Sequence, residues 1–276
     1  MAAEASEYLE NLRYCVRWLA EERSGPRAAD EFLKEAGDNE SALFTAYRDL
    51  ANVREPLPAT KQFLAIQDAM LQETTIRKGI TDAHAIMPIP RDQRIALWRG
   101  DITALRVDAI VNAANAQMLG CWIPGHHCID NAIHSFAGVQ LRIECARLMQ
   151  EQGHEDPTGK AKVTPAYNLP AGCIIHTVGP ICQGEPSGRD RAYLSSCYAR
   201  CLDAAATEGC KDIAFCCIST GAFGFPQREA ALIATDTVVR WLDAHPKTPL
   251  RVIFNVFTQE DQEIYFSRLY EQLNVR

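Results

Sequence analysis

The pattern of apolar positions divides the chain into two parts of different character. In residues 1–85, apolar side chains recur at helical spacing, and no run of strand-like alternation interrupts them. Gly25-Pro26 ends the first stretch, and Pro56 and Pro58 end the second. The pattern predicts a small all-helical extension in which no residue indicates chemistry. Its three helical stretches are 7–22, 43–53 and 61–79.

From residue 94 onward, short apolar runs alternate with longer helical stretches. Runs of buried-strand length occupy residues 94–98, 107–112, 173–178, 213–218 and 252–257. Helical spacing fills residues 129–149, 190–208 and 227–244. This alternation predicts an α/β domain with a central, mostly parallel sheet and helices on both faces. Ligands of such sheets bind at the carboxyl ends of the strands, where the unusual segments of this chain fall.

Composition narrows the class of protein. With 276 residues, 47% of them apolar, the chain can bury an ordinary core. The formal charge of −7 and the lack of a basic block argue against a nucleic-acid partner. No apolar stretch approaches the roughly 18 to 20 residues that a membrane span needs, and the acidic N-terminus does not resemble a signal peptide. We therefore expect a cytoplasmic protein whose 11 cysteines are reduced, so that clustered cysteines indicate metal binding or catalysis.

A glycine-rich segment follows the fourth strand-like run. Residues 219–226 read Ser-Thr-Gly-Ala-Phe-Gly-Phe-Pro, contain no Lys or Arg, and end in a proline, which is favoured at the start of a helix. Backbone N–H groups in such a loop can form a nest for a phosphate or diphosphate. A simple tight turn between strand and helix explains the same composition.

A segment rich in cysteine and histidine follows the second strand-like run. Cys121, His126 and Cys128 have the spacing Cys-x4-His-x-Cys, and His127 competes with His126. Thiolates with an imidazole suit zinc, and three protein ligands leave a fourth tetrahedral position open, as in catalytic sites. The alternative is that both cysteines are small buried side chains and the histidines line a surface loop.

Three polar residues flank this segment. Asn112 and Asn115 stand at a strand end, where their amides suit sugar hydroxyls, although asparagine is also an ordinary turn residue. Asp130 begins the next predicted helix, where a carboxylate suits the helix dipole. Its functional alternative is to orient a water or a ribose hydroxyl. His134 lies one turn later on the same side.

Four motifs in order resemble those of the macrodomain family, which binds ADP-ribose. They are Gly-Asp-Ile-Thr at 100–103, Asp-Ala-Ile-Val-Asn-Ala-Ala-Asn at 108–115, Ile-Asp-Asn-Ala-Ile-His at 129–134, and the loop at 219–226. The resemblance implies a three-layer α/β/α fold with a mixed, mostly parallel sheet over residues 86–276, preceded by the helical extension 1–85. The resemblance assigns the binding of the adenine base to Asp101, Ile102 and Phe257. Asn112 is added to the ligand-binding set, and the loop that wraps the diphosphate consists of Ser219, Thr220, Gly221, Ala222, Phe223, Gly224 and Phe225.

One departure from the common pattern indicates a subclass. Where hydrolytic macrodomains of the common type carry a run of glycines, this chain carries residues 121–128. That segment resembles the zinc-dependent macrodomains, a microbial branch that also has a helical N-terminal extension. The resemblance implies that Cys121, His126 and Cys128 hold Zn²⁺ beside the proximal ribose. It also implies ADP-ribose removal from acidic side chains, aspartate in particular, and a lipoyl-carrier-like partner protein modified by a sirtuin-type transferase.

These expectations lead to one hypothesis and two alternatives. In the first, the protein is a zinc-dependent protein-ADP-ribose hydrolase in which Asn115 holds the proximal ribose and Asp130 positions a water or hydroxyl. In the second, it is a reader that binds ADP-ribosylated proteins without cleaving them. The third is hydrolysis of O-acetyl-ADP-ribose, which uses the same site. Metal content and turnover distinguish the hypotheses.

Overall fold

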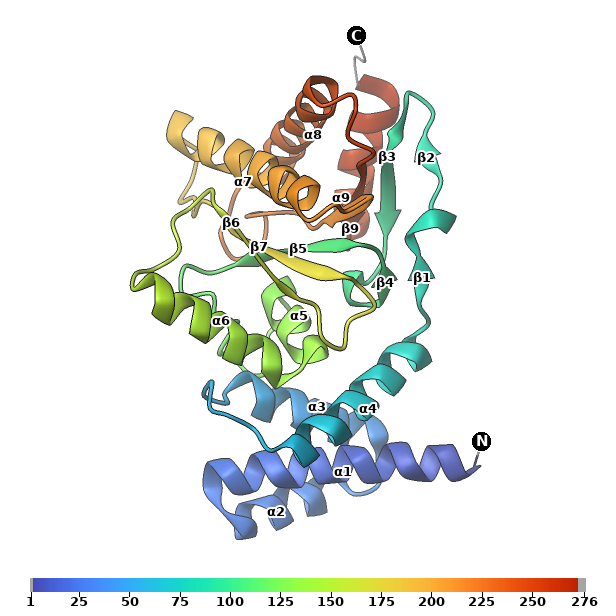
Figure 1. The fold of residues 1–276 in the computed structure, drawn as a ribbon, viewed down its shortest axis with the longest axis vertical. Helices are drawn as coiled ribbons and strands as arrows, with labels where there is room; N and C mark the ends of the chain where they lie inside the picture. Colours follow the sequence, from blue (N-terminus) through green and yellow to red (C-terminus); the bar gives the residue numbers. More distant parts are fainter. Residues whose placement is uncertain (1, 273–276) are drawn as a thin grey trace. The chain divides into compact units, whose positions relative to one another are not determined.

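The computed structural model describes residues 2–272, with the side chains of residues 7–271, and it divides into two compact units. The first unit comprises the chain up to Gly79 together with Leu119–Leu148 and Tyr167–Leu169. The second comprises Ile80–Met118, Met149–Ala166 and the chain from Pro170 onward. Figure 1 shows the elements of both. The domain boundary expected at residue 85 stays a prediction.

Four helices form the N-terminal part of the first unit: α1 (Ala2–Ser24), α2 (Pro26–Ala36), α3 (Glu40–Asn52) and α4 (Lys61–Lys78). Helix α1 packs against the other three around a core that includes Leu12, Leu43 and Phe63, none of which is exposed. The predicted helical region is confirmed, but α2 was not predicted. Gly25-Pro26 does end α1, as expected, but Pro26 is also the first residue of α2, where its missing N–H costs nothing.

The first unit also contains α5 (Ile129–Ala137) and most of α6 (Val139–Gln152). The single helix expected over 129–149 is therefore wrong. The helix is interrupted at Gly138, whose φ of +95° is one that residues other than glycine rarely adopt. A Cβ at this position would also lie 2.6 Å from the side-chain nitrogen of Gln67 in α4.

The second unit is built on a seven-stranded sheet in which only the two outermost pairs are antiparallel. The mixed, mostly parallel sheet is thus confirmed. The edge strands β2 and β6 were not predicted, and a separate two-stranded sheet pairs β1 (Thr81–Asp82) with β4 (Leu105–Arg106). The order of the seven is β2 (Pro88–Ile89), β3 (Asp92–Arg99), β9 (Arg251–Val256), β8 (Asp212–Phe215), β5 (Ala109–Ala114), β7 (Cys173–Val178) and β6 (Ala161–Pro165).

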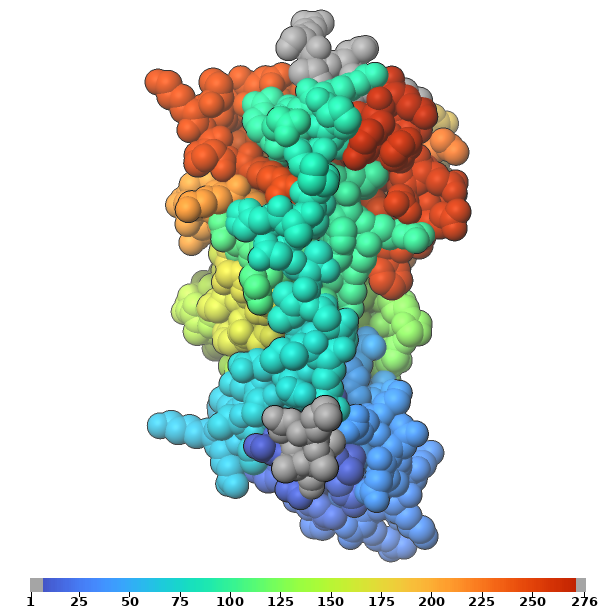
Figure 2. Space-filling model, turned by 90° about the vertical axis from the view of Figure 1, so that its right-hand side faces the viewer, coloured from blue at the N-terminus to red at the C-terminus, as the bar shows by residue number. Residues whose placement is uncertain are grey.

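Three helices flank this sheet: α7 (Gly188–Thr207), α8 (Gln227–Ala244) and α9 (Gln259–Phe266). Helix α7 packs on β6 and β7, α9 packs on β3 and β9, and α8 packs against both helices. The α/β class with flanking helices is therefore confirmed. Figure 2 shows the segment that leads into β3, in teal, on the surface of this unit, where Met87 is largely exposed.

Two further observations concern the cysteines and the helices. The expected run 213–218 placed Cys216 and Cys217 inside a strand. Strand β8 instead ends at Phe215, so both cysteines lie beyond it. All eleven cysteines are free thiols. No helix within residues 2–272 is long and apolar enough to cross a membrane.

Candidate active site

The three expected metal ligands lie together in the first unit. The candidate ligand atoms of Cys121, His126 and Cys128 are all within 4.8 Å of one another, and the distance from Cys121 Sγ to His126 Nδ1 is 3.4 Å. These side chains are partly buried, whereas His127 is exposed and does not join the group. The geometry therefore favours His126 over His127. We call residues 120–128 the Cys-His-Cys loop.

Local structure explains how this loop forms. Gly120 has a φ of +79°, and a Cβ there would lie 2.8 Å from the His134 imidazole, so the position admits only glycine without a shift. The His126 N–H donates a hydrogen bond of 3.2 Å to the Ile123 carbonyl and so closes a turn. Cys128 is the N-cap of α5, and its Sγ accepts a hydrogen bond of 3.4 Å from the Asn131 N–H. Two of the three candidate ligands are thus fixed by backbone geometry.

The chemistry of these donors suits a soft divalent metal. The pKa of the Cys128 thiol is raised to about 12, chiefly by burial and in smaller part by the nearby Cys121, while the hydrogen bond from the Asn131 N–H opposes the shift. A metal replaces the thiol protons and neutralises the charge of paired thiolates. Two sulfurs with one imidazole leave a tetrahedral position open. The donor set therefore fits zinc.

Asp130 stands in the first turn of α5, as expected from the sequence. Asp130 is buried, with 5% of the residue exposed, and its Oδ1 is 3.5 Å from Nε2 of His134 one turn later. The two side chains therefore share one face of the helix, as their spacing indicates.

In the second unit, the residues expected to bind adenine stand at the ends of neighbouring strands. Strands β3 and β9 pair in parallel, and the Gly100 N–H donates to the Val256 carbonyl over 3.1 Å. A Cβ at Gly100 would clash with the Trp98 ring, so the close turn requires glycine. Asp101 caps the short turn Ile102–Ala104 by accepting from the N–H of Thr103 over 2.9 Å. Phe257, directly after β9, is 76% exposed and can offer its ring for stacking.

The two asparagines of the strand end have different environments. Asn112 is fully buried, and its Nδ2 is 3.1 Å from Nδ1 of His176. The other ring nitrogen of His176, Nε2, forms a hydrogen bond of 2.9 Å with the Thr164 hydroxyl. Asn115 is partly buried and closes a turn by accepting from the Gln117 N–H over 3.0 Å. The structure thus gives Asn112 a partner inside the sheet, while Asn115 stands where the strand has ended.

The segment at residues 219–225, which we call the Gly-rich loop, turns sharply between β8 and α8. Ser219 has a φ of +66° and Gly224 one of +69°. A Cβ at Gly224 would lie 2.8 Å from the Cys182 carbonyl oxygen. Among the described residues, no backbone carbonyl accepts a hydrogen bond from the N–H groups of Gly221, Ala222 and Phe223. Consecutive amides of this kind form an anion nest.

The structure therefore collects the predicted residues in two sets. Cys121, His126, Cys128 and Asp130 lie in the first unit, and the expected adenine and diphosphate residues lie in the second. Sequence reasoning missed Arg142, a buried arginine that donates to the carbonyl of Cys121 over 3.4 Å. Its one local signal is a charge beside the apolar stripe of α6.

Comparison with known proteins decides the family. A model described as Macro domain matches residues 111–234, a range that contains both loops. A protein of Treponema medium named Protein-ADP-ribose hydrolase is 52% identical over 230 residues, which is 83% of this chain and 88% of the relative. The chain belongs to the macro domain family. The expected resemblance to macrodomains is thereby confirmed, and membership in the zinc-dependent branch stays a prediction.

Two further relatives extend the comparison. A Staphylococcus aureus (strain MRSA252) protein, also named Protein-ADP-ribose hydrolase, is 50% identical over 224 residues, or 81% of this chain and 83% of the relative. A Fusarium oxysporum f. sp. cubense protein named Probable bifunctional ADP-ribose hydrolase/ADP-ribosyltransferase is 43% identical over 260 residues, or 86% of this chain and 44% of the relative. The match thus fills less than half of that longer protein.

Solved macrodomain structures share the fold. The Oceanobacillus iheyensis macrodomain with ADP is 36% identical, with a TM-score of 0.58 over 63% of this chain and 89% of that one. The Trypanosoma brucei macrodomain in complex with ADP-ribose is 30% identical, with a TM-score of 0.61 over 79% of this chain and 93% of that one.

Proposed function

We propose that this macrodomain is a zinc-dependent protein-ADP-ribose hydrolase that removes mono-ADP-ribose from acidic side chains, aspartate preferred. The observation that carries the proposal is the grouping of Cys121, His126 and Cys128 within 4.8 Å. That grouping occurs in a chain about half identical to proteins named Protein-ADP-ribose hydrolase. A protein that only binds ADP-ribose does not need three metal ligands with an open fourth position.

We assign the binding of ADP-ribose to a carboxylate, an aromatic ring and backbone amides, with no contribution from Lys or Arg. Asp101 accepts from the adenine amino group, the backbone at Ile102 adds a contact, and Phe257 stacks on the base. The Gly-rich loop binds the diphosphate through the amides of Gly221, Ala222 and Phe223, which suits the overall charge of −7.

The reaction consumes one water and breaks the ester between the proximal ribose and the protein carboxylate, giving ADP-ribose and a free carboxylic acid that loses its proton. Zinc, when bound, supplies Lewis acidity beside the ribose. Asn115 holds the proximal ribose through its amide. Asp130 accepts a hydrogen bond from the water or hydroxyl and so orients it.

The partner follows from the same assignment. We propose an ADP-ribosylated protein, with a lipoyl-carrier-like protein modified by a sirtuin-type transferase as the first candidate. The proposal also includes a cytoplasmic location, where reducing conditions keep Cys121 and Cys128 available to a metal.

The test uses a peptide carrying ADP-ribose on aspartate. We expect the purified protein to contain about one zinc per chain and to release ADP-ribose, and a strong chelator to abolish release without abolishing ADP-ribose binding. Tight binding without release indicates a reader and contradicts the proposal. Release of acetate from O-acetyl-ADP-ribose with no action on the peptide indicates the deacetylase alternative.

A further inference from the structure

The Cys-His-Cys loop is held by hydrogen bonds from a helix that precedes it by about 70 residues. Asn131, which is fully buried, donates through Nδ2 to Asn52 Oδ1 over 2.7 Å and to the Ile123 carbonyl over 3.1 Å. Its Oδ1 accepts from Nη2 of Arg48 over 3.0 Å. The backbone N–H of the same Asn131 donates to Cys128 Sγ. Hydrogen bonds therefore connect helix α3 to the candidate metal ligand Cys128 through a single residue, Asn131.

A second connection joins the end of α3 to Cys121. Arg142 is buried, with 4% exposed, and its Nη1 donates over 2.8 Å to each of the Asn52 and Arg54 carbonyls. Its Nη2 donates to the Cys121 carbonyl, and its guanidinium lies 4.2 Å above the Trp122 ring. Carbonyls at a helix C-terminus lack partners within the helix and carry partial negative charge. One buried cation therefore caps α3 and fixes the first residues of the loop.

We propose that the helical N-terminal segment positions the metal ligands. Asn52 and Arg48 act through Asn131, and Arg142 acts through the Cys121 carbonyl, to hold the loop in the arrangement that brings the two sulfurs and the imidazole together. The inference rests on the proposed function for its metal, and on the hydrogen bonds alone for its geometry. It gives the extension a role that its own sequence does not indicate.

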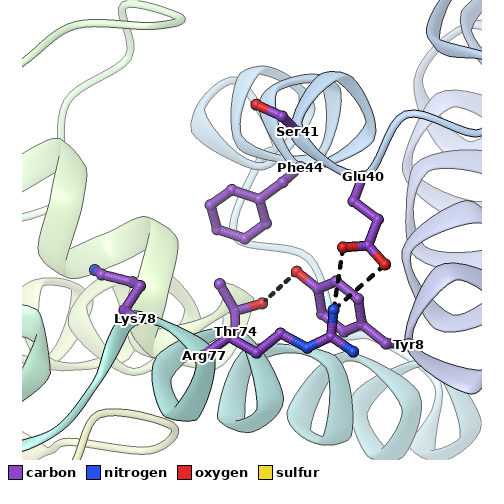
Figure 3. Close-up of a pocket in the computed structure, with 7 residues that line it drawn as sticks. All are labelled: Tyr8, Glu40, Ser41, Phe44, Thr74, Arg77 and Lys78. Atoms are coloured by element: carbon purple, nitrogen blue, oxygen red, sulfur yellow. Dashed lines mark hydrogen bonds and ion pairs between the residues drawn. The ribbon is translucent and has the colours of Figure 1, made fainter. Parts of the chain in front are cut away.

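The first turn of α3, which begins at Glu40, supplies a control. A hollow of about 280 Å³ lies here. Figure 3 shows two of its polar contacts: Arg77 pairs with Glu40, over 3.0 Å, and the Tyr8 hydroxyl lies 3.0 Å from that of Thr74. None of the described residues lining it belongs to the Cys-His-Cys loop. Arg77→Ala thus removes a bundle arginine with an α3 partner and leaves the loop contacts intact.

The experiment compares Arg48→Ala and Asn52→Ala with Arg77→Ala in the full chain. Hydrogen exchange of the metal-free proteins reports on residues 120–131, and titration with Co²⁺ gives the metal affinity and the absorption bands of cobalt–thiolate coordination. We expect both loop variants to speed exchange in this segment about tenfold and to weaken Co²⁺ binding roughly 10- to 100-fold, as loss of groups that orient ligands does. Arg77→Ala should change neither by more than about twofold.

Conservative variants separate positioning from general loss of stability. Asn52→Asp keeps the oxygen that accepts from Asn131 and should retain loop protection and the cobalt spectrum. Arg142→Lys keeps the charge but loses the fork that joins Cys121 to the α3 carbonyls, so its spectrum should shift even if Arg142→Ala does not fold.

Two outcomes overturn the inference. The first is that exchange and cobalt binding of Arg48→Ala and Asn52→Ala equal those of the wild type. The second is that Arg77→Ala disturbs the loop as much as they do. If the wild type binds no metal while the loop variants still speed exchange at 120–131, the zinc part of the proposed function fails and the positioning role stands.

Discussion

The Cys-His-Cys loop and the Gly-rich loop offer different parts of the chain to a ligand. The first offers two thiols and an imidazole, which buried polar side chains from α3 and α6 hold in place. The second offers backbone amides, and its shape depends on positive φ angles at Ser219 and Gly224.

This difference determines how each loop can fail. A site made of side chains is lost when a ligand or a group that orients it is removed. A site made of backbone is lost only when the backbone is forced to move, for example by an added Cβ. Substitutions in one loop should therefore leave the function of the other intact, and the predictions below test that separation.

The largest effect is expected at His126. His126→Ala removes one of three ligands and should weaken zinc binding by at least about 100-fold, since loss of groups that only orient a ligand already weakens binding 10- to 100-fold. His127→Ala, at the exposed neighbour, should stay within about threefold of the wild type. Competition with a chromophoric chelator measures both affinities, and a larger effect at His127 would reverse the assignment.

A smaller effect is expected at Gly224. Gly224→Ala adds a Cβ 2.8 Å from the Cys182 carbonyl at a φ of +69°, a conformation that costs other residues roughly 1 to 2 kcal/mol. We expect ADP-ribose affinity, measured by calorimetry, to fall about 10- to 30-fold while zinc content is unchanged. Gly188→Ala is the matched control, because a Cβ there meets nothing within 4 Å. Equal affinity of the two variants would contradict a backbone-built site.

The buried histidine beside Asn112 gives the second unit a pH-dependent stability. Burial lowers the pKa of His176 to about 3. Below pH ~6.5 the unfolded chain takes up a proton that the folded chain refuses, so stability falls by about 1.4 kcal/mol per pH unit until pH nears 3.

Denaturant unfolding of metal-free protein at pH 7 and pH 5 measures this effect. The wild type should lose about 2 kcal/mol more between these pH values than His176→Gln, which has no proton to gain in this range. Identical losses in the two proteins would show that His176 is protonated in the folded state.

The smallest effect is expected from salt. Because the Gly-rich loop contains no Lys or Arg, ADP-ribose affinity should change by less than about threefold between 50 and 200 mM salt, where sites built on several basic side chains lose far more. A steep salt dependence would indicate that basic side chains outside the loop hold the diphosphate.

The sequence predicted features that depend on local order. The strand-to-loop motifs placed Asp101, Asn115 and residues 219–225 after strands, because an apolar run followed by a polar loop marks where a strand gives way to a loop. The last residue of a strand was less well located, since the run expected to end at residue 218 ends at Phe215. The Cys-x4-His-x-Cys spacing likewise located the metal candidates. Gly138, which divides one expected helix into two, was misinterpreted, and Pro26 was recognised as the end of one helix but not as the start of the next.

What the sequence did not predict depends on contacts between distant segments. Nothing near Asn52 indicates that it bonds to Asn131, 79 residues later, or that Arg142 links α3 to Cys121. The choice between His126 and His127 depends on the turn that the His126 N–H closes on the Ile123 carbonyl. Strand β6 was missed because it is a short edge strand of half-exposed residues ending in proline.

The central claim, catalysis that depends on the metal ligands but not on ADP-ribose affinity, is tested most directly by Cys128→Ala with Cys173→Ala as a cysteine control. Both the affinity for ADP-ribose and the turnover of an aspartate-modified peptide are measured on the same metal-analysed preparation. The account predicts affinity within about threefold of the wild type and turnover reduced by at least about 100-fold, with the control unchanged in both. Wild-type turnover by zinc-free Cys128→Ala would contradict it.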